Sequence, residues 1–323
     1  MASGPLITTL AGIGAIVVLR VLYWLTQFLT FHFWKPSHPL TAYKRAGVDT
    51  YALITGASAG IGLGIARALV RQGFGVILLG HLPDEVALAA KALDSPRVRT
   101  LVVNAQTATP KQISAAVDSI SDLNISILVN NVGGLPMAEP KLRSLSTLSI
   151  AEVDAHVDLN ARFMARLTNL ALPLLSSPTR KTHERSLILN LSSAGRVGMP
   201  WIVMYSATKA FNYAFTTALA RELEDEPATA HIDCLVVIPG DVQSQSNIMA
   251  EGRPTSDVYG AAVVGSVDGA VKRGWREFRP NWRHDVETGL MDRVLPESLL
   301  TMFAKEELRV KKDRWHADEA KRR

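Results

Sequence analysis

Residues 51–62 read Tyr-Ala-Leu-Ile-Thr-Gly-Ala-Ser-Ala-Gly-Ile-Gly, and this stretch decides the fold of the chain. The apolar run Tyr51–Ile54 predicts a buried strand, and the segment after it predicts a turn that leads into a helix. Gly56 permits the tight turn, Gly60 lets backbone approach a phosphate, and Gly62 lets the helix pack closely on the strand. The helix N-terminus then points its positive end at the phosphates. Strand, glycine loop and helix in this order predict a dinucleotide site.

Apolar runs of strand length recur along the chain and alternate with stretches of helical character. The remaining runs are Gly75–Leu79, Val98–Val103, Ile125–Asn130, Ser186–Leu191 and Ile232–Ile238, with helices expected at about 61–72, 84–93, 110–121, 147–172 and 203–224. Strands that are apolar throughout are typical of parallel sheets covered on both faces. The pattern therefore predicts an α/β fold with a doubly wound parallel sheet, and ligands at the carboxyl ends of its strands.

The N-terminal segment Leu6–Trp34 is apolar, and Arg20 is its only formal charge. About 20 apolar residues suffice for a helix to cross a bilayer. With Leu6–Leu25 in the bilayer core, Arg20 lies near one end and can reach the interface. Lys35, Lys44 and Arg45 follow the segment, so the positive-inside rule places the rest of the chain in the cytosol. We expect a transmembrane helix rather than a cleaved signal peptide; a hairpin that dips into one leaflet stays open.

These observations divide the chain into four parts. We expect a membrane anchor at 1–35, a linker at 36–49, the α/β domain at 50–285 and a helical, basic extension at 286–323. The formal charge of +5 is a mild excess of 35 basic over 30 acidic residues and gathers near the C-terminus, so it does not indicate a nucleic-acid partner. The single cysteine, Cys234, excludes an intrachain disulfide and a cysteine-cluster metal site, and we expect no metal.

Tyr205 and Lys209 are four residues apart in the helix expected after the fifth strand, so they share one face of it. An ammonium near a phenol lowers the phenol pKa, which would make Tyr205 a usable general acid. Ser192 and Ser193 end the preceding strand, where either hydroxyl could bond a carbonyl oxygen. Each serine by itself could equally cap a turn.

Taken together, these motifs resemble the short-chain dehydrogenase/reductase family over roughly residues 50–245, which implies a Rossmann-like fold. The glycine loop matches, and the family's Asn-Asn-Ala-Gly element appears as Asn130-Asn131-Val132-Gly133. The resemblance implies that Tyr205 is the proton donor, that Lys209 binds the ribose and lowers the tyrosine pKa, and that Asn160 kinks its helix and supports a proton relay. Ser192 lies 13 residues before Tyr205 and begins Ser-x-x-Gly, as the family serine does, so it is the preferred catalytic serine, with Ser193 left open.

The second strand ends Leu79-Gly80-His81, without the carboxylate that NAD sites place there for the ribose 2′-hydroxyl. We therefore expect NADP(H), with His81 facing a 2′-phosphate. The resemblance implies that Asn104 lies near the adenine and that Ser244, within a segment resembling Pro-Gly-x-Val-x-Thr, contacts the nicotinamide. The cofactor residues are then Gly56, Ser58, Gly60, Ile61, Gly62, His81, Asn104, Asn131, Tyr205, Lys209, Pro239, Val242 and Ser244.

Within the family, the anchor, the glycine loop and Tyr205-Ser-Ala-Thr-Lys209 are most similar to microsomal 3-oxoacyl-CoA reductases and the related 17β-hydroxysteroid dehydrogenases. This resemblance implies an oxidoreductase of the endoplasmic reticulum membrane, facing the cytosol, that reduces a lipid-borne ketone. A ketoreductase that tailors a sterol or secondary metabolite is the alternative, and a non-catalytic nucleotide-binding sensor or scaffold is the alternative of another class. Residues 196–204 are expected to wall the substrate, Trp275–Trp282 to dock on the bilayer or cover the entrance, and the two long helices to offer contacts for a homo-oligomer.

Overall fold

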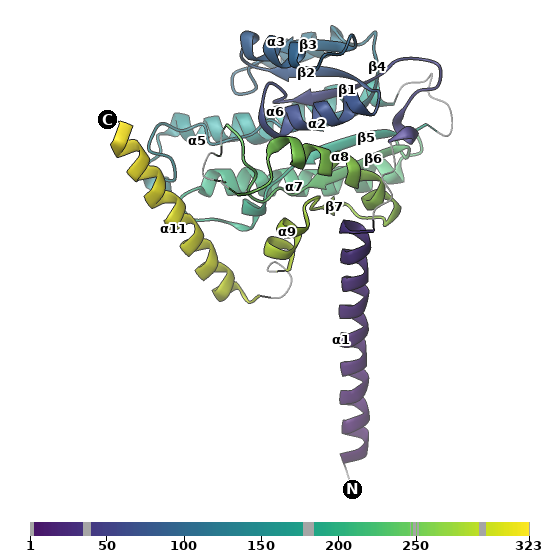
Figure 1. Ribbon diagram of the computed structural model, residues 1–323, viewed down its shortest axis with the longest axis vertical. Helices are drawn as coiled ribbons and strands as arrows, with labels where there is room; N and C mark the ends of the chain where they lie inside the picture. Colours follow the sequence, from purple (N-terminus) through teal and green to yellow (C-terminus); the bar gives the residue numbers. More distant parts are fainter. Residues whose placement is uncertain are drawn as a thin grey trace. The chain divides into compact units, whose positions relative to one another are not determined.

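The computed structural model describes residues 3–34, 40–176, 184–245, 247, 250, 252–290 and 295–322. The chain divides into two units, 1–38 and 39–323, and each is described by itself. The first unit is one long helix, α1 (Ser3–His32), coloured purple in Figure 1. Its stretch Ile7–His32 has a mean hydropathy of 1.8 and is long and apolar enough to cross a membrane, by length and composition. Residues 35–39, which hold the first part of the expected linker, lie outside the described residues.

The second unit is built on a seven-stranded sheet in which all neighbouring strands are parallel (Figure 1). Its order is β3-β2-β1-β4-β5-β6-β7, so the direction of winding reverses between β1 and β4. The strands are β1 (Thr50–Thr55), β2 (Gly75–Gly80), β3 (Val98–Val102), β4 (Asn124–Asn130), β5 (Ser186–Leu191), β6 (Ile232–Val237) and β7 (Glu277–Phe278). This confirms the predicted doubly wound parallel sheet, and it places the reversal, where such folds bind ligands, beside the glycine loop.

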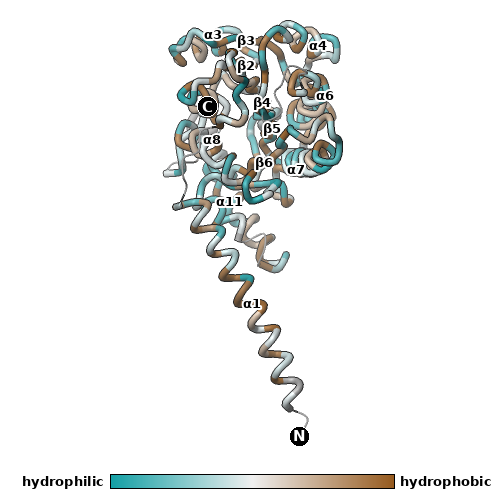
Figure 2. The backbone as a smooth tube through the Cα atoms, turned by 90° about the vertical axis from the view of Figure 1, so that its right-hand side faces the viewer, coloured by the Kyte–Doolittle hydropathy of each residue, from teal (hydrophilic) through white to brown (hydrophobic). Residues whose placement is uncertain are grey.

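Helices cover both faces of the sheet, as Figure 2 shows with α3 and α8 on one side and α4, α6 and α7 on the other. The helices of the two layers are α2 (Gly60–Arg71), α3 (Pro83–Ala92), α4 (Pro110–Asp118), α5 (Ile150–Val157), α6 (Phe163–Leu175), α7 (Val203–Asp225) and α8 (Ser256–Lys272). The core between the sheet and the second layer packs Leu53, Leu128 and Ile188 against Leu167 and Leu219. Burial of these apolar faces stabilises the layers.

Helices α2 and α8 approach each other through two glycines. A Cβ on Gly64 would lie 2.2 Å from the carbonyl oxygen of Ser256, and one on Gly260 would lie 2.2 Å from the carbonyl carbon of Gly64. Neither position has room for a side chain. The contact fixes α8, and the segment that leads into it from β6, against the helix that follows the glycine loop.

The segment at 40–49 packs on the domain. The Tyr43 hydroxyl donates to Asp233 at 2.8 Å, and Arg185 binds the same carboxylate through Nε and Nη2 at 2.7 Å each. Arg45 is buried and donates to the Ser186 hydroxyl at 2.8 Å. These bonds hold the segment against the starts of β5 and β6.

After α8, the sequence shows only a weak periodicity of apolar residues. Within Trp275–Trp282, Phe278, Arg279 and Pro280 are buried, and β7 closes the edge of the sheet next to β6. The expectation that this stretch docks on a bilayer is therefore wrong for its central residues. The short helix α9 (Trp282–His284), the π-helical turn η5 (Asp285–Leu290) and the long helix α11 (Glu297–Arg322) follow.

Candidate active site

The glycine loop between β1 and α2 forms a backbone cradle. Gly56 and Gly60 adopt φ of +61° and +59°, a left-handed conformation that glycine adopts without steric cost. A Cβ on Gly62 would lie 2.3 Å from the Gly56 carbonyl oxygen, so only glycine fits there. Helix α2 begins at Gly60 and presents its positive N-terminus at the cradle. The loop therefore fits the pyrophosphate of a dinucleotide, as predicted.

Asn131, expected to bind the cofactor, is committed to bracing this loop. Its Nδ2 donates to the carbonyl oxygens of Thr55 and Gly56 at 3.0 Å each. Its backbone N–H donates to the Thr55 hydroxyl at 2.9 Å. The side chain thus sets the shape of the cradle from the neighbouring strand β4.

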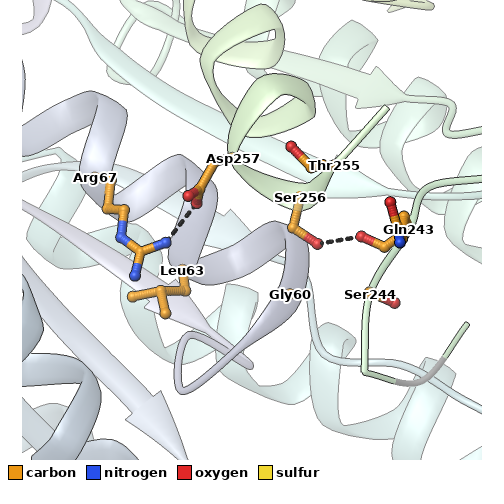
Figure 3. A pocket seen from close by; sticks show the side chains of 8 residues that line it. All are labelled: Gly60, Leu63, Arg67, Gln243, Ser244, Thr255, Ser256 and Asp257. Carbon is orange, nitrogen blue, oxygen red and sulfur yellow. Dashed lines mark hydrogen bonds and ion pairs between the residues drawn. The ribbon is translucent and has the colours of Figure 1, made fainter. Parts of the chain in front are cut away.

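A pocket of about 440 Å³ opens beside the cradle, between α2 and the segment that joins β6 to α8 (Figure 3). Gly60 and Ser244 both line it, and a Cβ on Gly60 would lie 3.7 Å from the Cβ of Ser244. Ser256 Oγ donates to the Gln243 carbonyl at 2.9 Å, and Arg67 pairs with Asp257 at 2.6 Å. Two predicted cofactor residues from distant parts of the sequence thus meet at one pocket.

Tyr205 lies in the first turn of α7, and a serine that follows β5 lies beside it. That serine is Ser193, whose hydroxyl accepts the Gly195 N–H at 3.1 Å. A Cβ on Gly195 would lie 3.5 Å from Ser193 Oγ and 3.7 Å from Cε1 of Tyr205, and Ser193 acts to lower the pKa of the phenol. Ser192 is buried, and its hydroxyl donates to the Lys209 carbonyl at 2.7 Å. Successive side chains of an extended strand point to opposite sides. The geometry therefore brings Ser193, and not the preferred Ser192, to the phenol.

Lys209 lies below the tyrosine ring rather than beside its oxygen. Its Nζ donates to the Leu191 carbonyl at 3.1 Å and lies 5.7 Å from the centre of the Tyr205 ring. Burial lowers the pKa of Lys209 to about 8. Burial also raises the pKa of Tyr205, an effect that Ser193 opposes and the Asp241 carboxylate strengthens. The phenol therefore carries its proton at neutral pH.

Asn160 lies in a π-helical turn, η3 (Asp158–Arg162), between α5 and α6. Its Oδ1 accepts the Gly134 N–H at 2.8 Å, and its Nδ2 donates to the Gly134 carbonyl at 3.0 Å. A Cβ on the neighbouring Gly133 would lie 2.8 Å from Lys209 Nζ and 2.9 Å from Asn160 Oδ1. The turn in the helix and the approach of Asn160 to Lys209 agree with the predicted positions of both residues.

His284 is a residue of this site that the sequence did not reveal. It is fully buried, its Nδ1 accepts the Gly240 N–H at 3.2 Å, and its Nε2 lies 2.9 Å from the Asp241 carbonyl oxygen. These bonds fix the neutral ring with the proton on Nε2. His284 thereby holds the loop that begins at Pro239 and carries the buried Val242. No motif surrounds His284, so only tertiary structure could identify it.

The predicted residues at the adenosine end lie apart from the catalytic group. His81 and Asn104 are exposed, and Asn104 Oδ1 accepts the Gln106 N–H at 3.0 Å in the turn after β3. Ser58 donates to the carboxylate of Glu85 at 3.3 Å. Ile61 is half-buried in the first turn of α2. Glu85, in the first turn of α3, therefore places a carboxylate near the end of β2, where none was expected from the sequence.

Among the residues that the structure describes, no group of three or more His, Cys, Asp and Glu side chains is placed to hold a metal ion. The candidate site consists of the glycine cradle and the Ser193, Tyr205, Lys209 and Asn160 cluster. Both lie at the carboxyl ends of the parallel strands.

The chain matches the description "short chain dehydrogenase" over residues 50–254. Among curated proteins it is 26% identical over 227 residues to a very-long-chain 3-oxoacyl-CoA reductase of Mycosarcoma maydis, an alignment that covers 67% of this chain and 62% of the relative. It is 26% identical over 265 residues to the protein of that name from Candida albicans, covering 76% and 72%. The chain thus spans less than two thirds of the Mycosarcoma maydis relative.

Solved structures share the fold. A short chain dehydrogenase from Escherichia coli CFT073, complexed with NADPH, superposes with a TM-score of 0.62 at 21% identity, over 72% of this chain and 97% of that one. A 3-ketoacyl-(acyl-carrier-protein) reductase from Brucella melitensis, complexed with NADH, superposes with a TM-score of 0.58 at 22% identity, over 68% and 93%.

Proposed function

The chain belongs to the short-chain dehydrogenase family, and from that premise we propose that it is a membrane-anchored, NADP(H)-dependent oxidoreductase that reduces a ketone on a lipid-like substrate to an alcohol. The substrate we propose is a 3-oxoacyl-CoA or a steroid-type ketone. The observation that carries the proposal is the grouping of Ser193 and Lys209 around Tyr205, beside a glycine cradle that fits a dinucleotide.

The proposed chemistry assigns one task to each side chain. When bound, the nicotinamide cofactor supplies the hydride that the carbonyl carbon takes up. Ser193 donates a hydrogen bond to the carbonyl oxygen and holds it near the phenol. Tyr205, protonated because burial raises its pKa, gives its proton to that oxygen as negative charge develops on it. The product is a secondary alcohol.

Two further residues support the proton donor. Lys209, with its ammonium beneath the ring, is placed to bind ribose hydroxyls and to stabilise the tyrosinate left by proton transfer. Asn160 fixes Gly134 and, through it, the loop that lies over Lys209. We assign Asn160 as a support for the Lys209 ammonium, and both residues as part of the route by which a proton returns to Tyr205.

The NADP(H) assignment is supported by the end of β2 and by structures of the same fold. Gly80 and His81 supply no carboxylate of their own, Glu85 of α3 reaches Ser58 instead, and the Escherichia coli structure of the same fold holds NADPH. The lipid-like substrate is supported by the names of the curated relatives and by three apolar residues near Tyr205, namely Met199 and Trp201 in the loop before α7 and Met204 in its first turn. The proposed location is the endoplasmic reticulum membrane, with α1 as the anchor and the catalytic domain in the cytosol.

The test is NADPH oxidation by the detergent-solubilised full-length protein with 3-oxoacyl-CoAs of increasing chain length and a set of ketosteroids, and with NADH in parallel. Turnover of a long-chain 3-oxoacyl-CoA with NADPH would support the proposal. NADPH binding without turnover of any acyl-CoA would favour another lipid, sterol or secondary-metabolite ketone. No turnover of any ketone would favour a non-catalytic nucleotide-binding protein.

The Tyr205→Phe variant tests the assigned proton donor. It should lose about 10²- to 10⁴-fold in kcat because general acid catalysis is removed, while its NADPH dissociation constant stays within about twofold. Tyr213→Phe, two turns further along α7, is the matched control and should keep wild-type turnover. Wild-type turnover by Tyr205→Phe would disprove the assignment.

A further inference from the structure

One face of the C-terminal helix α11 rests on the catalytic domain (yellow in Figure 1). The residues of α11 that are buried or half-buried between 301 and 315 recur every three or four positions, and they are Thr301, Ala304, Leu308, Lys311, Lys312 and Trp315. That spacing marks a single side of a helix. Met302 and Val310 on other sides are exposed. The helix therefore docks on the domain through one stripe.

Three residues at the C-terminal part of this stripe reach three separate loops. Lys311 pairs with Asp241 at 2.8 Å, in the loop after β6. Lys312 lies 4.9 Å from the centre of the Trp201 ring, in the loop after β5. Trp315 Nε1 donates to Glu139 at 2.8 Å, in the loop after β4.

These loops surround the proton donor. The β6 loop brings the Asp241 carboxylate close enough to Tyr205 to raise the pKa of its phenol, and Lys311 opposes that effect. In the β5 loop, Met199 and the Tyr205 ring both lie beside Gly195. The loop after β4 passes Lys209 and Asn160 at Gly133 and then continues to Glu139.

We propose that α11 is the outer wall of the substrate site, and that Lys312 and Trp315 select substrates by the length of their apolar chain. The helix spans the three loops that border the proton donor, and it adds an indole to the Trp201 ring already present there. Lys311 ties this wall to the loop held by His284. The inference rests on the proposed function for the identity of the substrate, whereas the docked position of α11 can be tested without any substrate.

The docked position is tested by cross-linking. The only native cysteine, Cys234, is buried, so introduced thiols can be modified selectively. In the full-length Glu139→Cys/Trp315→Cys variant, a short bismaleimide should join the two positions within one chain. The Glu139→Cys/Met302→Cys variant is the control, because position 302 lies about 20 Å along the helix from position 315. Equal cross-linking in both variants, or none in the first, would overturn the docked wall.

Selectivity is tested by comparing kcat/KM for a 16-carbon and a 4-carbon 3-oxoacyl-CoA, with NADPH. Trp315→Ala should lower the ratio of long to short about tenfold through a higher KM for the long chain, and Lys312→Ala should lower it less. Trp315→Phe keeps a ring and should retain most of the preference. Val310→Ala, on an exposed side of α11, should match the wild type, and all variants should bind NADPH equally.

The outcomes separate this inference from the proposed function. A wild type that reduces no 3-oxoacyl-CoA contradicts the proposed substrate, and the same variants are then compared on the ketosteroids that the wild type reduces. If the wild type reduces the acyl-CoAs, and Trp315→Ala and Lys312→Ala leave the long-to-short ratio of kcat/KM unchanged, then α11 does not select by chain length. The proposed function stands in that case.

Discussion

The hydroxyl of Ser193 and the ring of Tyr205 both border Gly195, within 3.5 and 3.7 Å of a Cβ placed there, and Ser193 acts to lower the pKa of the phenol. Its neighbour Ser192 turns the opposite way and donates to the Lys209 carbonyl at 2.7 Å. A substrate carbonyl held by Tyr205 can therefore receive a second hydrogen bond from Ser193 alone. The two adjacent serines offer a matched pair of variants.

We predict that Ser193→Ala lowers kcat about 10²-fold, the usual cost of removing one donor to a developing oxyanion. Ser192→Ala should keep kcat within about threefold and lose about 1 kcal/mol of stability, because it removes a buried hydrogen bond. Steady-state turnover and thermal unfolding of both variants check this. The reverse ranking of kcat would restore Ser192 as the catalytic serine.

We predict that NADPH binds more weakly above about pH 8. Burial lowers the pKa of Lys209 to about 8, so its ammonium is present below that pH and is lost above it. Fluorescence titration of NADPH between pH 6.5 and 9.5 measures the effect. The Tyr205→Phe variant should show the same weakening, since the Tyr205 pKa lies above its ordinary value. A dependence that disappears in Tyr205→Phe would assign it to the phenol instead.

We predict that His284→Leu weakens NADPH binding about tenfold, because leucine can neither accept the Gly240 N–H nor donate to the Asp241 carbonyl. Burial lowers the pKa of His284 from 6.5, and Glu287, Arg253 and Asp241 also act on it. Protonation of Nδ1 would break the Gly240 bond, so wild-type NADPH affinity should fall only at a pH below the ordinary histidine pKa. Glu287→Gln should retain this fall and His284→Leu should lack it. An identical fall in both variants would exclude His284 as its origin.

We predict that Glu85→Gln raises the preference for NADPH over NADH about five- to tenfold. The Glu85 carboxylate lies against Ser58 of the glycine loop, near the end of β2 where dinucleotide folds place the adenosine ribose. A negative charge there repels a 2′-phosphate by about 1 kcal/mol at a partly exposed site. Ratios of kcat/KM for the two cofactors measure the preference, with Asp84→Asn as the control. An unchanged ratio would show that Glu85 does not face the phosphate.

The sheet could be predicted because its strands are apolar throughout and its glycine loop has a fixed order. All six predicted strands occur, and Lys209 lies near the Tyr205 ring because helical spacing determines which side chains share a face. The edge strand β7 was missed, since two residues carry no pattern. Spacing preferred Ser192, whereas the structure points Ser192 to the Lys209 carbonyl and places Ser193 near Tyr205, because counting residues does not determine which way a strand-end side chain points.

Other parts of the site depend on contacts that no local pattern encodes. His284 lies 44 residues beyond Gly240 along the chain, and Lys311 lies 70 residues beyond Asp241. Glu85 lies five residues beyond the end of β2 along the chain, and the first turn of α3 brings it to Ser58. The effect of burial on the Tyr205 pKa likewise requires the packed structure.

The π-helical turn at Asp158–Arg162 makes the site sensitive to the number of residues in the chain as well as to their identity. Such a turn holds one residue more than an α-helix of the same rise. Removing that residue would restore regular α-helical hydrogen bonds and rotate Asn160 by about 100° relative to α6. The shortened helix could be the more stable one, yet the Asn160 amide would no longer face Gly134. Substitutions keep the number of residues in the turn, so proteins that carry it can differ widely in sequence. A one-residue deletion at this point would instead displace Asn160 from the site.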